Sequence, residues 1–140
     1  MGSGQRTFKP RHNRSTPTFQ PRTLNAERDR DQKLHKTGEW VNFRARFLRV
    51  NPECYCCGKA SRVVDHIEPS KGRTDVFERV GNHMALCIRC HNTITGKFDY
   101  KFGVGKDLTP KLAYIAQVRA REELIADRKF PPVRVIRYKE

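Results

Sequence analysis

Residues 54–67 read CYCCGKASRVVDHI, and this stretch decides how the chain is expected to fold. It opens with a Cys-x-x-Cys turn at Cys54 and Cys57 and ends in a β-branched run that carries Asp65 and His66. A strand of this composition is expected to be buried, and a buried carboxylate without a partner either costs free energy or takes up a proton. The rest of the chain must therefore supply partners for Asp65 and His66.

A second turn of the same type lies at Cys87 and Cys90. Each turn presents two thiolates to one ion, and two such turns complete the tetrahedral four-cysteine site that structural zinc prefers. We therefore predict that Cys54, Cys57, Cys87 and Cys90 bind Zn²⁺, against the alternatives of free thiols or disulfides. The chain has five cysteines, and this odd number argues against a complete disulfide framework. Cys56 is interpreted as a thiol outside the zinc site.

The predicted zinc site joins the two turns and so brings together the residues that follow each of them. Asp65 and His66 follow the first turn, and His91 follows the second. Carboxylate and imidazole groups are suitable ligands for a second, harder divalent ion. We predict that Asp65 and His91 bind this ion and that His66 takes a proton from an attacking water. The alternative is that these side chains are structural or merely exposed.

The chain is strongly basic, with 29 Lys and Arg against 15 Asp and Glu and a net charge of +14. Cationic proteins bind polyanions, so nucleic acid is the expected partner. No apolar run approaches the ~20 residues that span a bilayer, and no signal peptide is recognised, so no membrane partner is expected. Most of the net charge lies outside residues 37–100, which suits a grip on the DNA backbone; general solubility is the alternative.

Proline, glycine and hydrophobic spacing divide the rest of the chain. Residues 1–36 have few large apolar side chains and are predicted to be a basic, poorly ordered arm. Thr37 is predicted to cap a helix over 38–50, whose buried face carries Trp40, Phe43, Phe47 and Leu48. Further expected elements are strands over 62–67 and 84–86 with a loop over 68–81 between them, a helix opened by His91, a helix over 110–128, and a C-terminal segment that pairs as a strand or hangs free.

These motifs resemble the HNH endonucleases, whose α+β fold is the small ββα-metal unit. The three residues that give the family its name correspond to His66, Asn82 and His91. The resemblance covers about residues 40–100 and is carried by WVNFRARFL (40–48), the two cysteine pairs, VDHI (64–67) and NHMALCIRCHN (82–92). Small proteins of this kind are common in bacteriophages and their hosts, which implies a cytoplasmic location in a bacterial or phage-infected cell.

The resemblance implies three parts: a basic arm over 1–36, a zinc-stapled nuclease core over 37–103, and a C-terminal helix with a basic tail over 104–140. It implies that His66 is the general base and that Asn82 fixes the loop or orients that base. Asp65 and His91 would hold the catalytic ion, Mg²⁺ or another divalent ion such as Mn²⁺ or Ni²⁺. The implied substrate is DNA; no oligomeric state is indicated.

Two positions depart from the family pattern. Ile94 stands where such proteins often have a lysine, so phosphate contacts are expected from Lys97 or the basic flanks instead. His83 is interpreted as an exposed loop histidine, with an extra ligand or phosphate contact as the alternative.

Three other functions are compatible with parts of this sequence. They are a zinc-ribbon DNA-binding module without activity, an adaptor of a phage packaging machine, and a different nuclease chemistry on Glu68 and Lys71. The third would leave the zinc frame unused.

Overall fold

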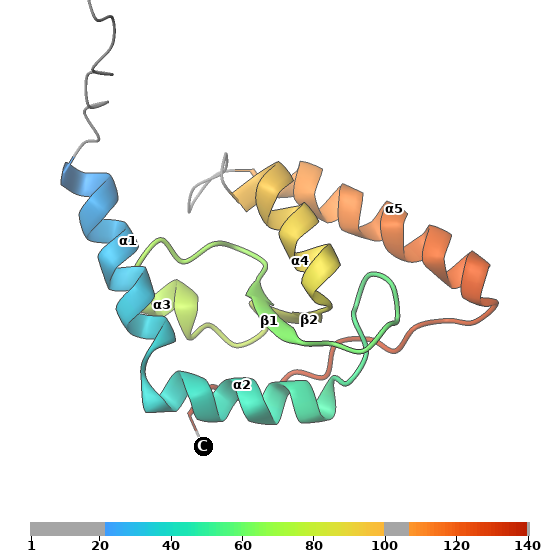
Figure 1. Ribbon diagram of the computed structural model, residues 1–140, viewed down its shortest axis with the longest axis horizontal. Helices are drawn as coiled ribbons and strands as arrows, with labels where there is room; N and C mark the ends of the chain where they lie inside the picture. The colour runs from blue at the N-terminus through green and yellow to red at the C-terminus, as the bar shows by residue number, and fades with distance from the viewer. Residues whose placement is uncertain (1–21, 100–106, 140) are drawn as a thin grey trace, which may run out of the picture.

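The computed structural model describes residues 22–99 and 107–139. A two-stranded antiparallel hairpin of β1 (Val63–His66) and β2 (His83–Leu86) lies at the centre, with helices around it (Figure 1). The helices are α1 (Arg22–His35), α2 (Gly38–Val50), α3 (Thr74–Phe77), α4 (Ile88–Ile94), the π-helical turn η1 (Thr95–Asp99) and α5 (Thr109–Ala126). The fold is therefore α+β, and the hairpin followed by α4 has the order of a ββα unit. None of the described helices is long and apolar enough to cross a membrane.

Helix α2 forms as its sequence predicts. The hydroxyl of Thr37 accepts a hydrogen bond from the backbone N–H of Trp40 at 3.2 Å and so caps the helix. Trp40, Phe43 and Phe47 recur on one face and are buried against Val64 and other residues of the hairpin. This aromatic face is the core on one side of the sheet.

The register of the hairpin sends alternate residues to opposite faces. Val64 pairs with Ala85 and packs with the aromatic residues of α2. Met84 and Leu86 belong instead to a second core cluster that also contains Ile94 and Ile115. Because both faces are covered, all four residues of β2 are buried. The hairpin is thus enclosed between α2 and the pair α4 and α5.

The expectation of a poorly ordered arm over 1–36 is wrong for residues 22–35, which form α1. Residues 1–21 lie outside the described part of the chain, as does the predicted boundary at residue 103. The loop predicted over 68–81 contains the short helix α3. Helix α4 begins at Ile88, three residues before His91, because the Sγ of Cys87 accepts from the N–H of Cys90 and caps it.

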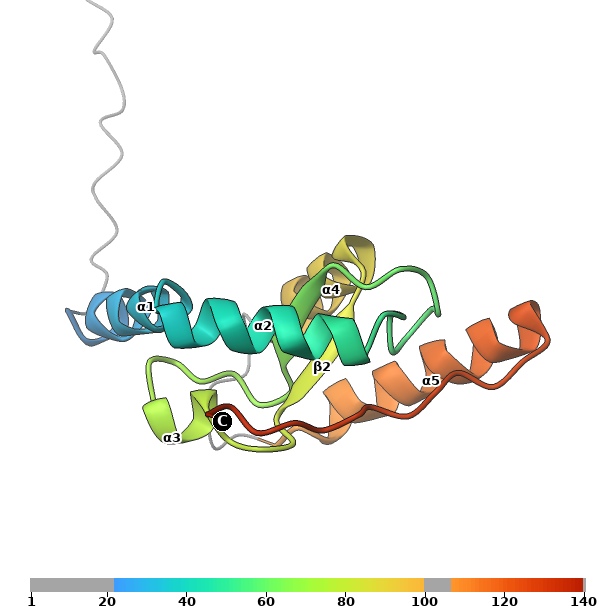
Figure 2. The same cartoon turned by 90° about the horizontal axis from the view of Figure 1, so that it is seen from below.

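The C-terminal segment after α5 neither forms a described strand nor hangs free. It runs back past α2 and ends beside α3 (Figure 2). The side chain of Asn51 holds it by bonding both the N–H of Arg134, at 2.8 Å, and its carbonyl, at 2.9 Å. Tyr138 is buried at its end against Phe43. These side-chain bonds replace the strand pairing that the sequence left open.

Candidate metal and catalytic site

The two Cys-x-x-Cys turns meet in space as predicted. One ligand atom from each of Cys54, Cys57, Cys87 and Cys90 lies within 4.8 Å of all the others. The Sγ atoms of Cys57 and Cys87 are 3.6 Å apart, close to the about 3.8 Å edge of a tetrahedron of thiolates around zinc. The cluster is therefore consistent with a zinc site, and it ties the turn before β1 to the start of α4. Cys56 is buried beside it and is not part of it.

A second group of polar side chains lines an open pocket at the end of β1. Its residues come from α1, β1, the loop after β1, α4 and η1, and they are Asp31, His35, Asp65, His66, Pro69, Ser70, Lys71, His91, Thr95 and Asp99. Asp65, His66 and His91 are thus brought together in one place. The pocket also contains residues from outside the motifs that predicted it.

Asp65 and His91 face each other without a hydrogen bond. The Oδ1 of Asp65 is 3.7 Å from the Nδ1 of His91, which is too long for one. The Oδ2 of Asp65 and the Nδ1 of His91 are buried and have no hydrogen-bond partner among the described residues, and neither has the Oγ1 of Thr95, four residues further along the chain. Buried polar atoms without partners are rare and costly. An oxygen and an imidazole nitrogen left in this way fit a divalent cation between them.

His66 is held in one orientation by its surroundings. Its Nε2 donates to the carbonyl of Phe77 at 3.1 Å, because a carbonyl can only accept. Its Nδ1 makes no hydrogen bond within the described residues. The ring stacks on Trp40, with ring centroids 5.4 Å apart. Burial, followed by the nearby His83, lowers the pKa of His66 to about 4, so the ring is neutral at neutral pH and can accept a proton at Nδ1.

The expectation that His83 is an exposed loop residue is wrong. His83 begins β2, is 2% exposed, and lies directly across the hairpin from His66. Its Nε2 donates to the same Phe77 carbonyl at 2.9 Å, and burial lowers its pKa. It does not line the pocket. Its place follows from the strand starting one residue earlier than predicted, which turns the side chain toward α2.

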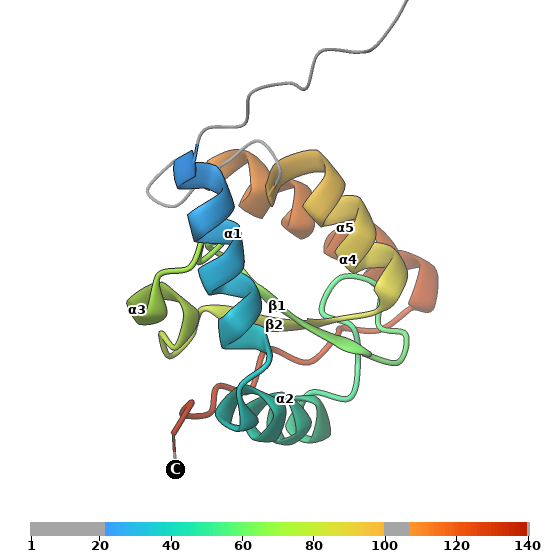
Figure 3. The ribbon, with the colours of Figure 1, turned by 60° about the vertical axis from the view of Figure 1, so that its left-hand side comes forward.

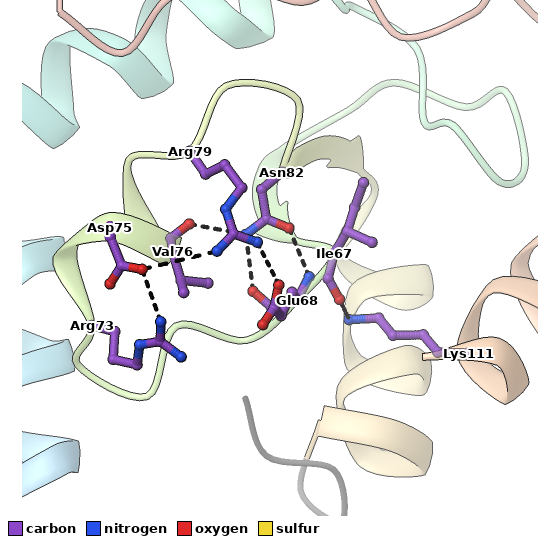
Figure 4. A network of polar contacts seen from close by, with 8 residues as sticks. All are labelled: Ile67, Glu68, Arg73, Asp75, Val76, Arg79, Asn82 and Lys111. Carbon is purple, nitrogen blue, oxygen red and sulfur yellow. Dashed lines mark hydrogen bonds and ion pairs between the residues drawn. The ribbon is translucent and has the colours of Figure 1, made fainter. Parts of the chain in front are cut away.

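Asn82 lies outside the pocket and ties the connection between the strands together. Its Nδ2 donates to the carbonyls of Glu68 and Val76, both at 3.0 Å, and its Oδ1 accepts from the N–H of Glu68 at 2.8 Å (Figure 4). Glu68 itself pairs with Arg79 at 2.6 Å and does not line the pocket. The amide of Asn82 therefore holds the loop after β1 against α3.

Lys111 is a residue of the site region that sequence reasoning missed. Its Nζ donates to the carbonyls of His66 (3.0 Å) and Ile67 (2.7 Å) and to Oδ1 of Asp99 (2.6 Å); Figure 4 shows the bond to Ile67. The side chain is 1% exposed. Lys111 thus joins α5 to the end of β1 and to η1. A lysine directly after the proline of a helix N-terminus carries no signal of burial.

The comparisons with known proteins find a similarity among solved structures. No family model matches the chain, and no curated protein matches it. Among solved structures, the chain is similar to the HNH endonuclease of the deep-sea thermophilic bacteriophage GVE2, in a crystal structure with manganese ion. The two are 25% identical over 53% of this chain and 87% of that chain, with a TM-score of 0.43.

Proposed function

We propose that this chain is a metal-dependent DNA endonuclease of the HNH type, with its nuclease core over residues 37–103. One observation carries the proposal: a buried carboxylate oxygen of Asp65 and a buried nitrogen of His91 lack hydrogen-bond partners among the described residues, beside the buried ring of His66. A purely structural site would have satisfied these atoms. The pocket that they line is open to solvent on one side, so a phosphodiester can reach it.

Asp65 and His91 would hold the catalytic ion, and their oxygen and imidazole donors suit Mg²⁺, Mn²⁺ or Ni²⁺. When bound, such an ion supplies positive charge that stabilises the charge developing on the phosphate and on the leaving oxygen. The two ligands are far apart in sequence but close in space, since Asp65 lies one residue before the end of β1 and His91 lies in the first turn of α4. The zinc cluster at the start of α4 holds this arrangement together.

His66 would act as the general base. The bond from its Nε2 to the Phe77 carbonyl leaves Nδ1 to take the proton of the attacking water. Stacking on Trp40 prevents the ring from turning away. An anionic phosphate in the pocket favours the protonated form, which raises the pKa of His66 toward the range where proton transfer is efficient. Asn82 would act indirectly, by holding the loop that follows β1.

DNA is the proposed substrate because of the charge of +14 and its concentration on the flanks of the core. Some basic side chains of the core serve the fold, such as Arg44, which donates to the carbonyl of Arg62 at 3.0 Å. A zinc-ribbon module without activity would explain the cysteines and the charge. It would leave the unpartnered atoms of Asp65 and His91 without a role.

The test is cleavage of supercoiled plasmid by the zinc-loaded protein with Mg²⁺, Mn²⁺ or Ni²⁺, with EDTA, and by the variant His66→Ala. Relaxation or linearisation that requires the ion and disappears in the variant is the expected result. Circular dichroism and zinc content must be the same for both proteins, so that loss of activity is not loss of fold. A folded, zinc-loaded wild type that cuts nothing under any of these ions refutes the proposal.

A further inference from the structure

Helix α1 and the loop at residues 70–72 form one wall of the pocket. Figures 1 and 3 place α1 and α4 on different sides of the hairpin. Helix α4 carries His91, while α1 contributes Asp31 and His35 to the lining. Helix α1 also lies before residues 40–100, over which the sequence resembles HNH endonucleases. The resemblance therefore assigns no role to the side chains that α1 contributes to the pocket.

The wall is tightly built around Asp31. The Oδ1 of Asp31 accepts from the hydroxyl of Ser70 and from the N–H of Gly72, the latter at 3.2 Å. Gly72 has φ +80°, and a Cβ there would lie 2.8 Å from the carbonyl oxygen of Glu27 in α1. Only glycine permits this approach. The carboxylate of Asp31 therefore fixes the loop at residues 70–72 to α1, and we call this pair of hydrogen bonds the clamp.

This clamp places Lys71 in the pocket. Lys71 lies between the two residues that Asp31 holds, and its φ of +49° is unfavourable for a residue with a side chain. Among the described residues that line the pocket, it is the one Lys or Arg. Its Nζ donates to the carbonyl of Asp99 at 3.2 Å, a long bond that a phosphate oxygen could replace.

His35 presents a second nitrogen from the same wall. Its Nδ1 donates to the carbonyl of Asp31 at 2.8 Å, and Nε2 has no bond to any described residue. In the imidazolium form both ring nitrogens donate, so that Nε2 can bind a phosphate oxygen. The ring stands edge to face against Phe77, at 4.9 Å between centroids, and its centroid is 5.9 Å from that of His66. The side chain is 40% exposed, so a ligand in the pocket can reach it.

We propose that Lys71 and His35, held in place by Asp31, bind the phosphate that is cut. This inference rests on the proposed nuclease function of the pocket. The pocket has carboxylates at Asp31, Asp65 and Asp99, so an anionic phosphate needs cationic or N–H donors to enter it. Neither of the two other positions considered for a phosphate contact lines the pocket. Ile94 is buried in the core, and the Nζ of Lys97 lies 5.5 Å from the centroid of the Tyr114 ring.

The matched variants are Lys71→Met and Arg73→Met. Both remove one positive charge and keep an aliphatic stem, but Arg73 is exposed and pairs with Asp75 outside the pocket. Cleavage of a labelled duplex is measured at saturating DNA and Mn²⁺. Loss of one charge-assisted hydrogen bond predicts that Lys71→Met lowers kcat by about 10- to 100-fold. KM changes little because one phosphate among many is affected, and Arg73→Met behaves like wild type.

His35→Phe tests the second donor, because a phenyl ring keeps the contacts with Phe77 and Trp40 and removes both nitrogens. We expect a loss of kcat of about 10-fold, with the zinc content unchanged and the Tm lowered by no more than the loss of the bond to the Asp31 carbonyl explains. Affinity for Mn²⁺ alone, measured by titration calorimetry, stays at the wild-type value in both pocket variants. Lys71→Arg restores part of the rate lost in Lys71→Met, which a merely structural role would not require.

Three different outcomes overturn the inference. If the wild type cuts DNA and Lys71→Met cuts as fast as Arg73→Met, the wall does not bind the phosphate and the nuclease proposal stands. If the folded, zinc-loaded wild type cuts nothing, the nuclease proposal fails and this inference fails with it. A fall in Mn²⁺ affinity equal to the fall in kcat would also overturn it, because the wall would then act on the metal ligands.

Discussion

The buried lysine of α5 offers the sharpest test of how the site is held together. Lys111 is 1% exposed, and its partner Asp99 is 14% exposed at a distance of 2.6 Å. Replacing Lys111 with methionine keeps most of the side-chain volume but removes all three hydrogen bonds from Nζ. The carboxylate of Asp99 and the carbonyls of His66 and Ile67 are then left without that donor.

Removing one partner of a buried ion pair costs 3–5 kcal/mol in general, and methionine recovers part of this through packing. We therefore expect Lys111→Met to lower the free energy of unfolding by about 3 kcal/mol. For a domain of this size, that corresponds to a Tm lower by about 10 °C. Denaturant unfolding at neutral pH measures the free energy, and calorimetry measures the Tm.

The double variant Lys111→Met with Asp99→Asn separates this mechanism from a simple packing defect. Asparagine removes the charge that lost its partner, so the double variant should be more stable than Lys111→Met alone. The reasoning is refuted if the free energy of unfolding of Lys111→Met lies within about 0.5 kcal/mol of the wild-type value, which is the usual limit of additivity. It is also refuted if the two substitutions are additive, since that would mean that the pair is not coupled.

Three further predictions concern the metal sites and the hairpin. Cys87→Ser should unfold the core and release zinc, because the energy of a structural zinc site is folding energy; a folded, active variant detected by circular dichroism and plasmid cleavage would contradict this. Asp65→Ala should abolish detectable Mn²⁺ binding in calorimetry and leave the zinc content at the wild-type value, since Asp65 is not in the cysteine cluster. Burial lowers the folded-state pKa of His83, so its contribution is present above the unfolded value of about 6.5 and is lost as the pH falls below it. His83→Phe should therefore make the Tm less sensitive to pH between 7 and about 5, while the Phe77 carbonyl keeps its bond from His66; an unchanged pH profile of the Tm would show that His83 is not the titrating group.

Much of the site could be predicted because its signals are local. The spacing of the cysteine pairs alone indicates a four-cysteine cluster, and the structure brings the four ligand atoms together. Once the two turns are joined, Asp65 and His91 must lie near each other, and they are 3.7 Å apart. The cap at Thr37 and the aromatic spacing of α2 are equally local, since both are read within a few turns of one helix.

What the sequence could not show depends on contacts between residues far apart in the chain. Helix α1 looks like part of a solvated arm because few of its residues are apolar, yet Asp31 anchors it to Ser70 and Gly72, about 40 positions later. The C-terminal segment has no strand pairing and is held by Asn51, 83 positions earlier.

The sequence by itself therefore determined the four-cysteine cluster, the hairpin and the residues at the centre of the pocket, because spacing within a turn or strand sets which side chains point the same way. Only the tertiary structure decided the pocket's wall and its support. Lys71 enters the pocket through a clamp from α1, and Lys111 is buried through two carbonyls and a carboxylate from other elements. A charged side chain carries no local sign of such partners, because its burial depends on hydrogen bonds that form only when the whole chain has folded.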